Sequence, residues 1–493
     1  MKKILIPIFI LLNLFLSCAY SENTCIKKLG SNYPRRLELA NCHLQDQDMP
    51  AVVAFLKYGD VSSLNLSNNN IGPRGAAYLT SVPLTDLIEL YMDHNNLGDK
   101  GAITIAKIQS PYLYILSLND NHISDQSMSA LSKLNISRLV RVSLSNNQIT
   151  SAGVAELLNN PYEYLELDNN FIGDTGASLL AKNLLLDNLS INNNQLTDTA
   201  AIALAQNLNL RGLNVANNNI TVKGARALAT IAKLGVLDIS NNQIGDDGVG
   251  AFVNTNIWKL NVSNNHIGPN GAIAIASRSI VSNNLDLNIS HNPIGLIGID
   301  ALSKSTIISS LDASETDFGD EGAIIFAANH PKFSILKLNK NHIGVKGATA
   351  LATGVKTQGL GLDSNDLGDA GAAVFADKKI AHLSLDDNHI TSEGVKAFQV
   401  FNRSMFSLSF ADNDIGDEGA VFLSHYGNII SLNLTNCGIG DVGALALANP
   451  DRTVLDVKLS KNPISKEAKE ALRKHYQTGL ELDDDDNKMK IKK

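Results

Sequence analysis

The chain has 493 residues, of which 44% are hydrophobic and 5% aromatic, and its formal net charge is −8. A chain of this length fits several ordinary domains or one long repeat array. Lysine and arginine are scattered singly through the body of the chain, which argues against a nucleic-acid-binding protein because such a protein needs a basic face.

The first residues have the composition of a secretory signal peptide, which we place at residues 1–21. Lys2 and Lys3 precede an apolar run from Ile4 to Leu16, and this run is too short for a membrane span, which needs about 20 residues. Two processing sites remain open. Cleavage after the A-x-A-like residues 19–21 gives a mature chain beginning at Glu22, whereas residues 14–18, "LFLSC", resemble a bacterial lipobox and imply a lipid on Cys18.

Residues 22–36 are expected to form an N-terminal cap. Cys25 and Cys42 lie close enough in the sequence to bridge in an oxidising compartment. Two free thiols are the alternative, and the cysteine count is too low for a disulfide framework.

From residue 37 to residue 478 the pattern L-x-L-x-x-N-x-I recurs eighteen times at spacings of 23–27 residues. The alternation L-x-L predicts a short strand with two inward aliphatic side chains, and stacked copies predict a parallel sheet. We call the residue at the asparagine position of each copy the ladder residue. The ladder residues are Cys42, Asn69, Asn95, Asn121, Asn147, Asn170, Asn194, Asn218, Asn242, Asn265, Asn292, Thr316, Asn341, Asn365, Asn388, Asn413, Cys437 and Asn462.

Stacked ladder asparagines are expected to be structural, since an amide side chain can satisfy the backbone groups that the chain exposes as it leaves each strand. Cysteine and threonine should do this less fully. The asparagine before the ladder residue, such as Asn264, is expected to have no such role. In the return segment, Asp417 can cap a helix N-terminus, and Gly416 permits the turn before it.

This periodicity resembles the leucine-rich repeats, and the glycine and alanine of the return segment resemble their ribonuclease-inhibitor type. The phrase "GALALA" at residues 443–448 is similar to the GALA-type repeats of bacterial effectors. The resemblance implies an α/β solenoid, a curved horseshoe with strands on the concave face and helices on the convex face. GALA-type effectors carry an F-box before their repeats, for which residues 22–36 leave no room, so a ubiquitin-related role is not expected.

Repeats of this kind bind partners on the concave sheet, where most exposed positions of this chain are serine, asparagine or aspartate. One group departs from this composition and is predicted to bind a protein partner. It lies in the third to sixth repeats and consists of Tyr91, Asp93, His94, Arg141, Tyr164, Glu166 and Asp168.

A second candidate is an acidic stretch in the fourteenth to sixteenth repeats, with His382 beside it. Such a stretch could attract a basic partner or weakly hold a divalent cation, although an ordinary solvated face is the simpler interpretation. A calcium loop fails at "DSNDLG", because Leu367 occupies the fifth position, and we assign no metal ligand. The stretch contains Asp363, Asp386, Asp387 and Asp412.

The sequence lacks a nucleophile elbow, a P-loop, an H-E-x-x-H motif and a zinc-spaced cysteine pair. We therefore expect no enzymatic activity and no cofactor. The favoured hypothesis is an exported monomer that binds a protein on its concave face, either a host-directed effector or a surface protein. The alternative is a lipid-anchored envelope protein that acts as a structural spacer or binds glycans.

The C-terminal end differs in charge from the repeats. Residues 465–477 predict a charged helix that caps the array, and residues 479–493 read as a disordered, solvated tail.

Overall fold

The computed structural model describes residues 24–27, 35–57, 60–134, 139–158, 160–278, 284–400, 405–425, 429–448, 456–476 and 479–483. It confirms the predicted α/β solenoid, because short parallel strands alternate with short helices along the chain. The chain divides into two compact units, which we describe separately. The first contains the described residues up to Gln243 with Thr255–Ile257, and the second contains Ile244–Asn254 and the described residues from Trp258 onward.

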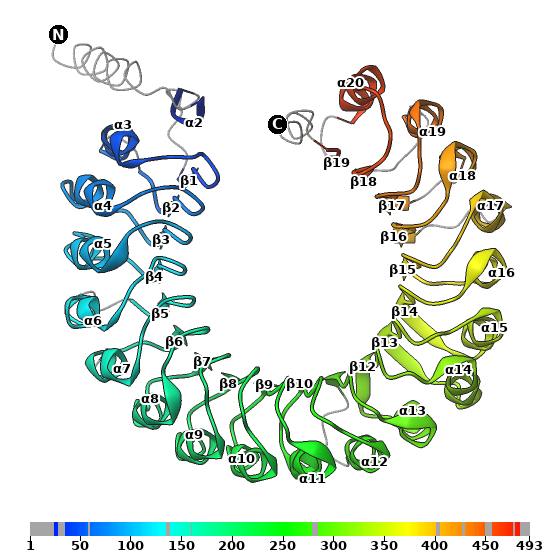
Figure 1. The fold of residues 1–493 in the computed structure, drawn as a ribbon, viewed down its shortest axis with the longest axis horizontal. Helices are drawn as coiled ribbons and strands as arrows, with labels where there is room; N and C mark the ends of the chain where they lie inside the picture. The colour runs from blue at the N-terminus through cyan, green and yellow to red at the C-terminus, as the bar shows by residue number, and fades with distance from the viewer. Residues whose placement is uncertain are drawn as a thin grey trace, which may run out of the picture. The chain divides into compact units, whose positions relative to one another are not determined.

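In the first unit each strand from β1 to β8 pairs in parallel with the next strand along the chain, and the inward leucines align in register. The strands lie on the inner side of the curve and the helices on its outer side (Figure 1). The elements are α2 Thr24–Lys27, β1 Arg36–Glu38, η1 Asp46–Asp48, α3 Met49–Leu56, β2 Ser63–Asn65, α4 Pro73–Leu79, β3 Glu89–Tyr91, α5 Gly98–Ile105, β4 Ile115–Ser117, α6 Asp125–Leu131, β5 Arg141–Ser143, α7 Ser151–Leu157, β6 Tyr164–Glu166, α8 Gly173–Leu180, β7 Asn188–Ser190, α9 Asp198–Leu204, β8 Gly212–Asn214, α10 Val222–Leu228 and β9 Val236–Asp238.

The second unit repeats this plan with several longer strands and helices, and β10 to β19 again pair in parallel in sequence order. Its elements are α11 Gly245–Gly250, η2 Ala251–Asn254, β10 Lys259–Asn261, α12 Pro269–Ala276, β11 Leu285–Asn288, α13 Gly295–Lys304, β12 Ile308–Asp312, α14 Gly319–Ala328, β13 Lys332–Lys337, α15 Val345–Gly354, β14 Lys356–Gly361, α16 Gly368–Ala373, β15 His382–Ser384, α17 Ser392–Val400, β16 Met405–Ser409, α18 Gly416–Ser424, β17 Ile429–Asn433, α19 Asp441–Leu447, β18 Asp456–Lys458, α20 Lys466–His475 and β19 Leu480–Glu481.

The ladder asparagines form the predicted chain of side-chain hydrogen bonds between neighbouring repeats. Asn218 is representative: its Oδ1 accepts the backbone N–H groups of Asn194 (3.0 Å) and Leu196 (2.9 Å) in the preceding repeat. Its Nδ2 donates to the carbonyls of Val215 and Ala216. The side chain is 7% exposed, so these bonds satisfy backbone groups that water cannot reach. The structural interpretation of the ladder is confirmed.

Threonine at the ladder position satisfies fewer backbone groups of the preceding repeat than asparagine does, as expected. The hydroxyl of Thr316 donates within its own repeat to the carbonyl of Ala313 (2.8 Å). The N–H of Ile294 in the preceding repeat therefore donates to the backbone carbonyl of Asn292 (2.8 Å) and not to the ladder residue of the next repeat. The equivalent N–H of Ile267 does donate to a ladder side chain, that of Asn292.

The residue before the ladder position has a conformational role that the sequence pattern did not indicate. Asn264 has a φ of 49°, and the equivalent residues of other repeats are also left-handed, from Asn41 (57°) to Lys461 (60°). Asparagine and glycine tolerate this conformation better than most residues. The pair of asparagines therefore combines a backbone turn with an inter-repeat hydrogen bond.

Asp417 caps a helix N-terminus as predicted, and the helix that it caps is the next one along the chain. Asp417 lies in the first turn of α18, but its Oδ1 accepts the N–H groups of Gly440 (2.7 Å) and Gly443 (2.9 Å) at the start of α19. A Cβ on Gly443 would lie 2.7 Å from this oxygen, so glycine leaves room for the carboxylate. Gly416 has the expected turn conformation, with a φ of 60°.

The same inter-repeat cap recurs along both units. A carboxylate in the first turn of one helix accepts N–H groups at the start of the next helix, where they would otherwise lack a partner. The donor–acceptor pairs include Gly72–Asp46, Ser124–Asp99, Thr150–Asp125, Thr197–Asp174, Thr221–Asp198, Gly268–Asp246, Gly344–Asp320, Thr391–Asp369 and Ser465–Asp441.

The two ends of the described chain add features that the sequence left open or placed elsewhere. Cys25 and Cys42 are joined in a disulfide. At the C-terminal end, Leu480–Glu481, assigned from sequence to the disordered tail, instead forms β19 beside β18. Leu480 and Leu482 repeat the L-x-L pattern, so the signal for this strand was present in the sequence.

The predicted signal peptide and its candidate lipidation residue Cys18 lie outside the described residues. Within the described part of the chain, no helix combines the length and the apolar character needed to cross a membrane.

Replacing Asn218 with alanine should lower the free energy of unfolding by about 1–3 kcal/mol, because buried N–H groups of the preceding repeat lose their acceptor. Urea titration followed by circular dichroism measures the change. Asn218→Cys should cost less, since the chain itself carries cysteine at Cys437, where the thiol donates to the carbonyl of Phe410. Asn217→Gly, which keeps the left-handed turn, is the control, and an equal loss there would contradict the assignment.

Candidate functional site

The exposed face of each sheet carries three columns of side chains. We call them the leading column (the residue before the first inward aliphatic), the middle column (between the two aliphatics) and the trailing column (after the second). In β5 the leading residue is Arg141 and the middle residue is Ser143, and in the third repeat the trailing residue is Asp93. These columns decide which predicted site residues are available to a partner.

In the first unit Arg141 and Tyr164 are neighbours in the leading column, because they are register partners in β5 and β6. Arg141 forms an ion pair with Glu166, whose second oxygen accepts the hydroxyl of Ser143 (2.7 Å). The Arg141 side chain remains 45% exposed. Together these residues present an aromatic ring and a guanidinium group at one point of the sheet.

Tyr91 lies in the middle column of β3, two strands from Arg141. Burial raises the pKa of its hydroxyl, and the negative charge of Glu89 raises it further, while Arg141 and Arg36 oppose the shift. Tyr91 therefore stays a neutral hydrogen-bonding phenol at physiological pH. We call Tyr91, Arg141, Tyr164 and Glu166 the first-unit patch.

The other predicted residues of this group have structural contacts. Asp93 Oδ1 accepts the Ser117 hydroxyl (2.6 Å) and the N–H of Asn119 (2.8 Å) in the next repeat. Asp168 Oδ1 accepts the corresponding groups of Ser190 and Asn192, both at 2.7 Å. Burial raises the pKa of the Asp168 carboxyl, and the hydrogen bond from Ser190 opposes this. Trailing-column carboxylates thus cap the backbone of the following strand.

His94 is separate from these contacts, since it occupies a left-handed turn position and pairs with Asp120 (2.6 Å). Its side chain is 53% exposed. It lies at the carboxyl side of the strands, whereas Arg141 and Tyr164 lie at their amino side.

The sequence analysis missed the aromatic and apolar residues just before the strands. Ile88 and Tyr114 are each more than two-fifths exposed, and the N–H of Tyr114 donates to the carbonyl of Ile88 (2.7 Å). They precede Glu89 and Ile115, which are register partners. The signal was their position two residues before the L-x-L motif, just ahead of the leading column.

In the second unit the acidic residues fall into two classes. Asp363 and Asp386 lie in the trailing column, and Asp363 Oδ1 accepts the N–H of Asp386 (3.1 Å). Asp387 and Asp412 occupy left-handed turn positions and are exposed. Asp412 accepts the side-chain amide of Asn436 (2.7 Å).

Asp386 has the most perturbed carboxyl of this group. Its Oδ1 accepts the Ser409 hydroxyl (2.5 Å) and the N–H of Ala411 (2.7 Å). Burial raises the pKa of Asp386 to about 6, and the negative charges of Asp363 and Asp412 add to the increase, while the bond from Ser409 opposes it. Among the described residues, no group of three or more histidine, cysteine, aspartate or glutamate side chains is arranged to hold a metal ion.

The same strands carry an apolar surface at their amino side, opposite to the side that carries the acidic residues. The ring of His382 stacks on Phe406 with centroids 5.7 Å apart, and Phe406 is 58% exposed. Gly359 and Gly361 occupy the leading and middle positions of β14, between β13 and β15. A Cβ on Gly359 would meet only ordinary contacts, the nearest being Ile335 Cγ1 at 3.6 Å. Packing alone therefore does not explain glycine at this position.

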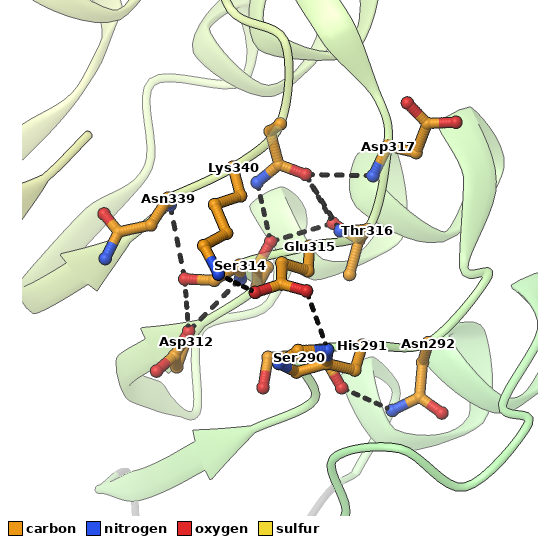
Figure 2. A network of polar contacts seen from close by, with 12 residues as sticks. Ser290, His291, Asn292, Asp312, Ser314, Glu315, Thr316, Asp317, Asn339 and Lys340 are labelled. Carbon is orange, nitrogen blue, oxygen red and sulfur yellow. Dashed lines mark hydrogen bonds and ion pairs between the residues drawn. The ribbon is translucent and has the colours of Figure 1, made fainter. Parts of the chain in front are cut away.

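Charged residues also connect three repeats along the carboxyl side of the strands in the second unit (Figure 2). Glu315 accepts from Lys340 Nζ (2.8 Å) and pairs with His291 Nδ1 (2.9 Å). Hydrogen bonding and attraction to Glu315 raise the pKa of Lys340. His291, Glu315 and Lys340 all occupy left-handed turn positions. These three residues therefore combine backbone turns with exposed ion pairs and provide no reactive group.

Cys437, the free thiol among the described residues, is an unsuitable nucleophile. Burial raises the pKa of Cys437 to about 12, and the reactive species is the thiolate. The thiol serves instead as a ladder residue.

A family model described as "Leucine rich repeat" matches residues 185–244, and a second model of that description matches residues 61–79, 84–106, 109–132, 253–276, 329–352, 378–398, 401–424 and 428–448. The search of curated proteins found no significant match.

Three solved structures are similar at the level of the fold. The TLR13 chain of the TLR13–ssRNA13 complex has a TM-score of 0.51 and 18% identity over 85% of this chain, and the match spans 59% of the length of TLR13. An internalin (inlF) from Listeria monocytogenes has a TM-score of 0.37 and 18% identity, with 75% of this chain and 86% of that chain covered. Internalin C2 from the same organism has a TM-score of 0.33 and 23% identity, with 46% and 90% covered.

The raised pKa of Asp386 predicts a stability change with pH. The folded-state pKa of about 6 exceeds the ordinary aspartate pKa of 3.8. The stability that this carboxyl contributes is therefore fully present below pH 3.8 and is lost as the pH rises through about 6. Asp386→Asn keeps an acceptor for Ser409 and Ala411 but cannot ionise. This variant should unfold at higher urea concentration than the wild type at pH 7, and at nearly the same concentration at pH 4.

Asp386→Ala is the matched control, since it removes both the charge and the acceptor and should gain less than Asp386→Asn. An unchanged difference in urea midpoint between Asp386→Asn and the wild type across pH 4 to pH 7 would contradict the assignment.

Proposed function

Since this chain is a leucine-rich repeat protein, we propose that it is an exported, non-enzymatic scaffold that binds a protein partner on the exposed face of its sheet. Leucine-rich repeat scaffolds are typical of protein-binding domains, and the family is generally non-enzymatic. The proposal places the main contact at the first-unit patch.

The observation that carries the proposal is the grouping of Tyr91, Arg141 and Tyr164 within four consecutive strands, β3 to β6. Tyrosine and arginine are enriched among the residues that dominate binding energies at protein interfaces. Most other exposed positions of the strands carry small polar side chains. The ion pair between Arg141 and Glu166 is exposed, and such a pair contributes only about 0–1 kcal/mol, so a partner's carboxylate can replace Glu166 at little cost.

A protein partner is favoured over RNA, although the similar TLR13 structure is a complex with ssRNA13. RNA binding needs cationic side chains that neutralise phosphates. The first-unit patch offers one cation, already paired with Glu166, and the net charge of the chain is −8.

The finer assignment rests on the resemblance seen in the sequence. We assign the repeats to the ribonuclease-inhibitor type, closest to the GALA-type repeats but without an F-box, and propose a host-directed or surface role. The helices on the outer side and the glycine–alanine return segments support this subtype. We propose export as a secreted or periplasmic monomer, or as a lipoprotein attached through Cys18.

The first-unit patch can be tested by photo-crosslinking followed by affinity measurement. A photo-reactive residue at Ile115, between Glu89 and Arg141 in the leading column, should crosslink the partner, whereas one at Ala77 on α4 should not. For the identified partner, Arg141→Glu combined with Tyr164→Ala should weaken binding at least about thirtyfold, the effect of one interface hot spot of about 2 kcal/mol.

Arg74→Glu combined with Tyr78→Ala is the matched control, because it makes the same two changes on the exposed face of α4. Equal losses in the two double variants, or no loss in the first, would remove the patch as the binding site.

Export is tested by the mass of the N-terminal peptide of the protein from its native cell. A peptide beginning at Glu22, or at a lipid-modified Cys18, is the expected result. A peptide that retains the apolar run Ile4–Leu16 would contradict export through this signal.

A further inference from the structure

A cavity of about 190 Å³ lies in the second unit, where α15 leads into β14 and α16 leads into β15. Its apolar walls come from two consecutive repeats, with Leu351, Val355 and Leu360 from one and Phe375 and Ile380 from the next. Ala352, Lys356, Thr357, Lys378 and Lys379 complete the lining. The cavity lies at the amino side of the strands, away from the acidic trailing column.

Unequal helix lengths account for this space. Helix α15 has ten residues and leads into β14 through Val355 alone, whereas α16 has only six residues. The helices pack closely on the other side of α15, where a Cβ on Gly354 would lie 2.3 Å from the carbonyl oxygen of Ala327. The shorter helix α16 leaves the end of α15 incompletely covered.

Three lysines line the cavity, and a fourth lies on the neighbouring strand. Lys356, Lys378 and Lys379 line the cavity, and Lys332 is the register partner of Lys356 in β13. The exposed side chains of Lys332 and Lys356 thus belong to directly adjacent positions of the sheet. Like charges at such positions destabilise a sheet, so the arrangement costs free energy when the site is empty.

The local charge is opposite to that of the whole chain. The segments 327–334, 351–359 and 374–382 contain the four lysines and a single carboxylate, Asp377. Asp377 pairs with its neighbour Lys378 (3.0 Å). Within the described ranges, Lys332, Lys356 and Lys379 form no ion pair, whereas Lys340 and Lys458 each pair with a glutamate.

We propose that this cavity binds a small organic anion that carries an apolar group of about the size of a benzene ring. The volume supports this class, since an apolar cavity of roughly 150 Å³ accommodates benzene. The apolar walls receive the ring, and the lysines at the opening attract a carboxylate or phosphate group. This site is separate from the proposed protein-binding patch and does not depend on it.

The test uses the full chain and four ligands of similar shape, observed by saturation-transfer difference NMR. Benzoate and phenyl phosphate should both receive saturation from the protein, and a larger effect for one identifies the preferred head group. Benzyl alcohol should bind at least tenfold more weakly and benzylamine should not bind. High salt should weaken benzoate binding, because screening reduces the attraction of the lysines.

Two variants separate the charges from the apolar walls. Lys356→Gln combined with Lys379→Gln should weaken benzoate binding at least tenfold and leave the weak binding of benzyl alcohol unchanged. Ala352→Leu fills the cavity and should weaken the binding of both ligands. Lys346→Gln, on an exposed position of α15, is the control and should bind benzoate like the wild type.

Absence of saturation transfer to both benzoate and phenyl phosphate would overturn the proposal. Equal binding of benzoate and benzylamine would also overturn it. So would benzoate binding that stays unchanged both in Lys356→Gln combined with Lys379→Gln and in Ala352→Leu, while circular dichroism shows these variants folded.

Discussion

Most repeats in the described part of the chain depend on a neighbour to satisfy backbone groups that their own residues leave unpaired. Where the next repeat carries a ladder asparagine, its side chain accepts buried N–H groups at the end of the strand, as Asn218 does for Asn194 and Leu196. An unpaired buried N–H costs about as much as a lost hydrogen bond. A single repeat is therefore incomplete by itself, and the regular spacing of the ladder follows from this requirement.

Two further sets of side chains act in the opposite direction along the chain. Helix-start carboxylates such as Asp417 and trailing-column carboxylates such as Asp93 accept N–H groups of the following repeat. Ladder residues serve the preceding repeat and these carboxylates serve the following one, so a change in one repeat reaches both neighbours. This agrees with stability in repeat proteins as a sum of repeat and nearest-neighbour interface terms.

The sequence predicted the features that depend on local pattern, namely the strands, the parallel sheet and the ladder. It could not identify which N–H groups donate to Asp417, because a first-turn aspartate has the same sequence context whether it caps its own helix or the next one. It could not identify the left-handed turn before each ladder residue, since Lys461 and Glu315 share that conformation. The lysine-rimmed cavity was hidden because it arises from a difference in length between α15 and α16.

The division of the exposed face into columns limits where a partner can be recognised. Trailing positions carry side chains that cap the next strand, as Asp168 does for Asn192, so their chemistry is constrained by folding. Leading positions have no comparable shared duty, and they hold residues as different as Arg141, Tyr164, Ile335, Gly359 and His382. Variation is therefore least costly to the fold at the amino side of the strands. Recognition residues should concentrate there, and the acidic trailing column owes its composition first to the backbone it caps.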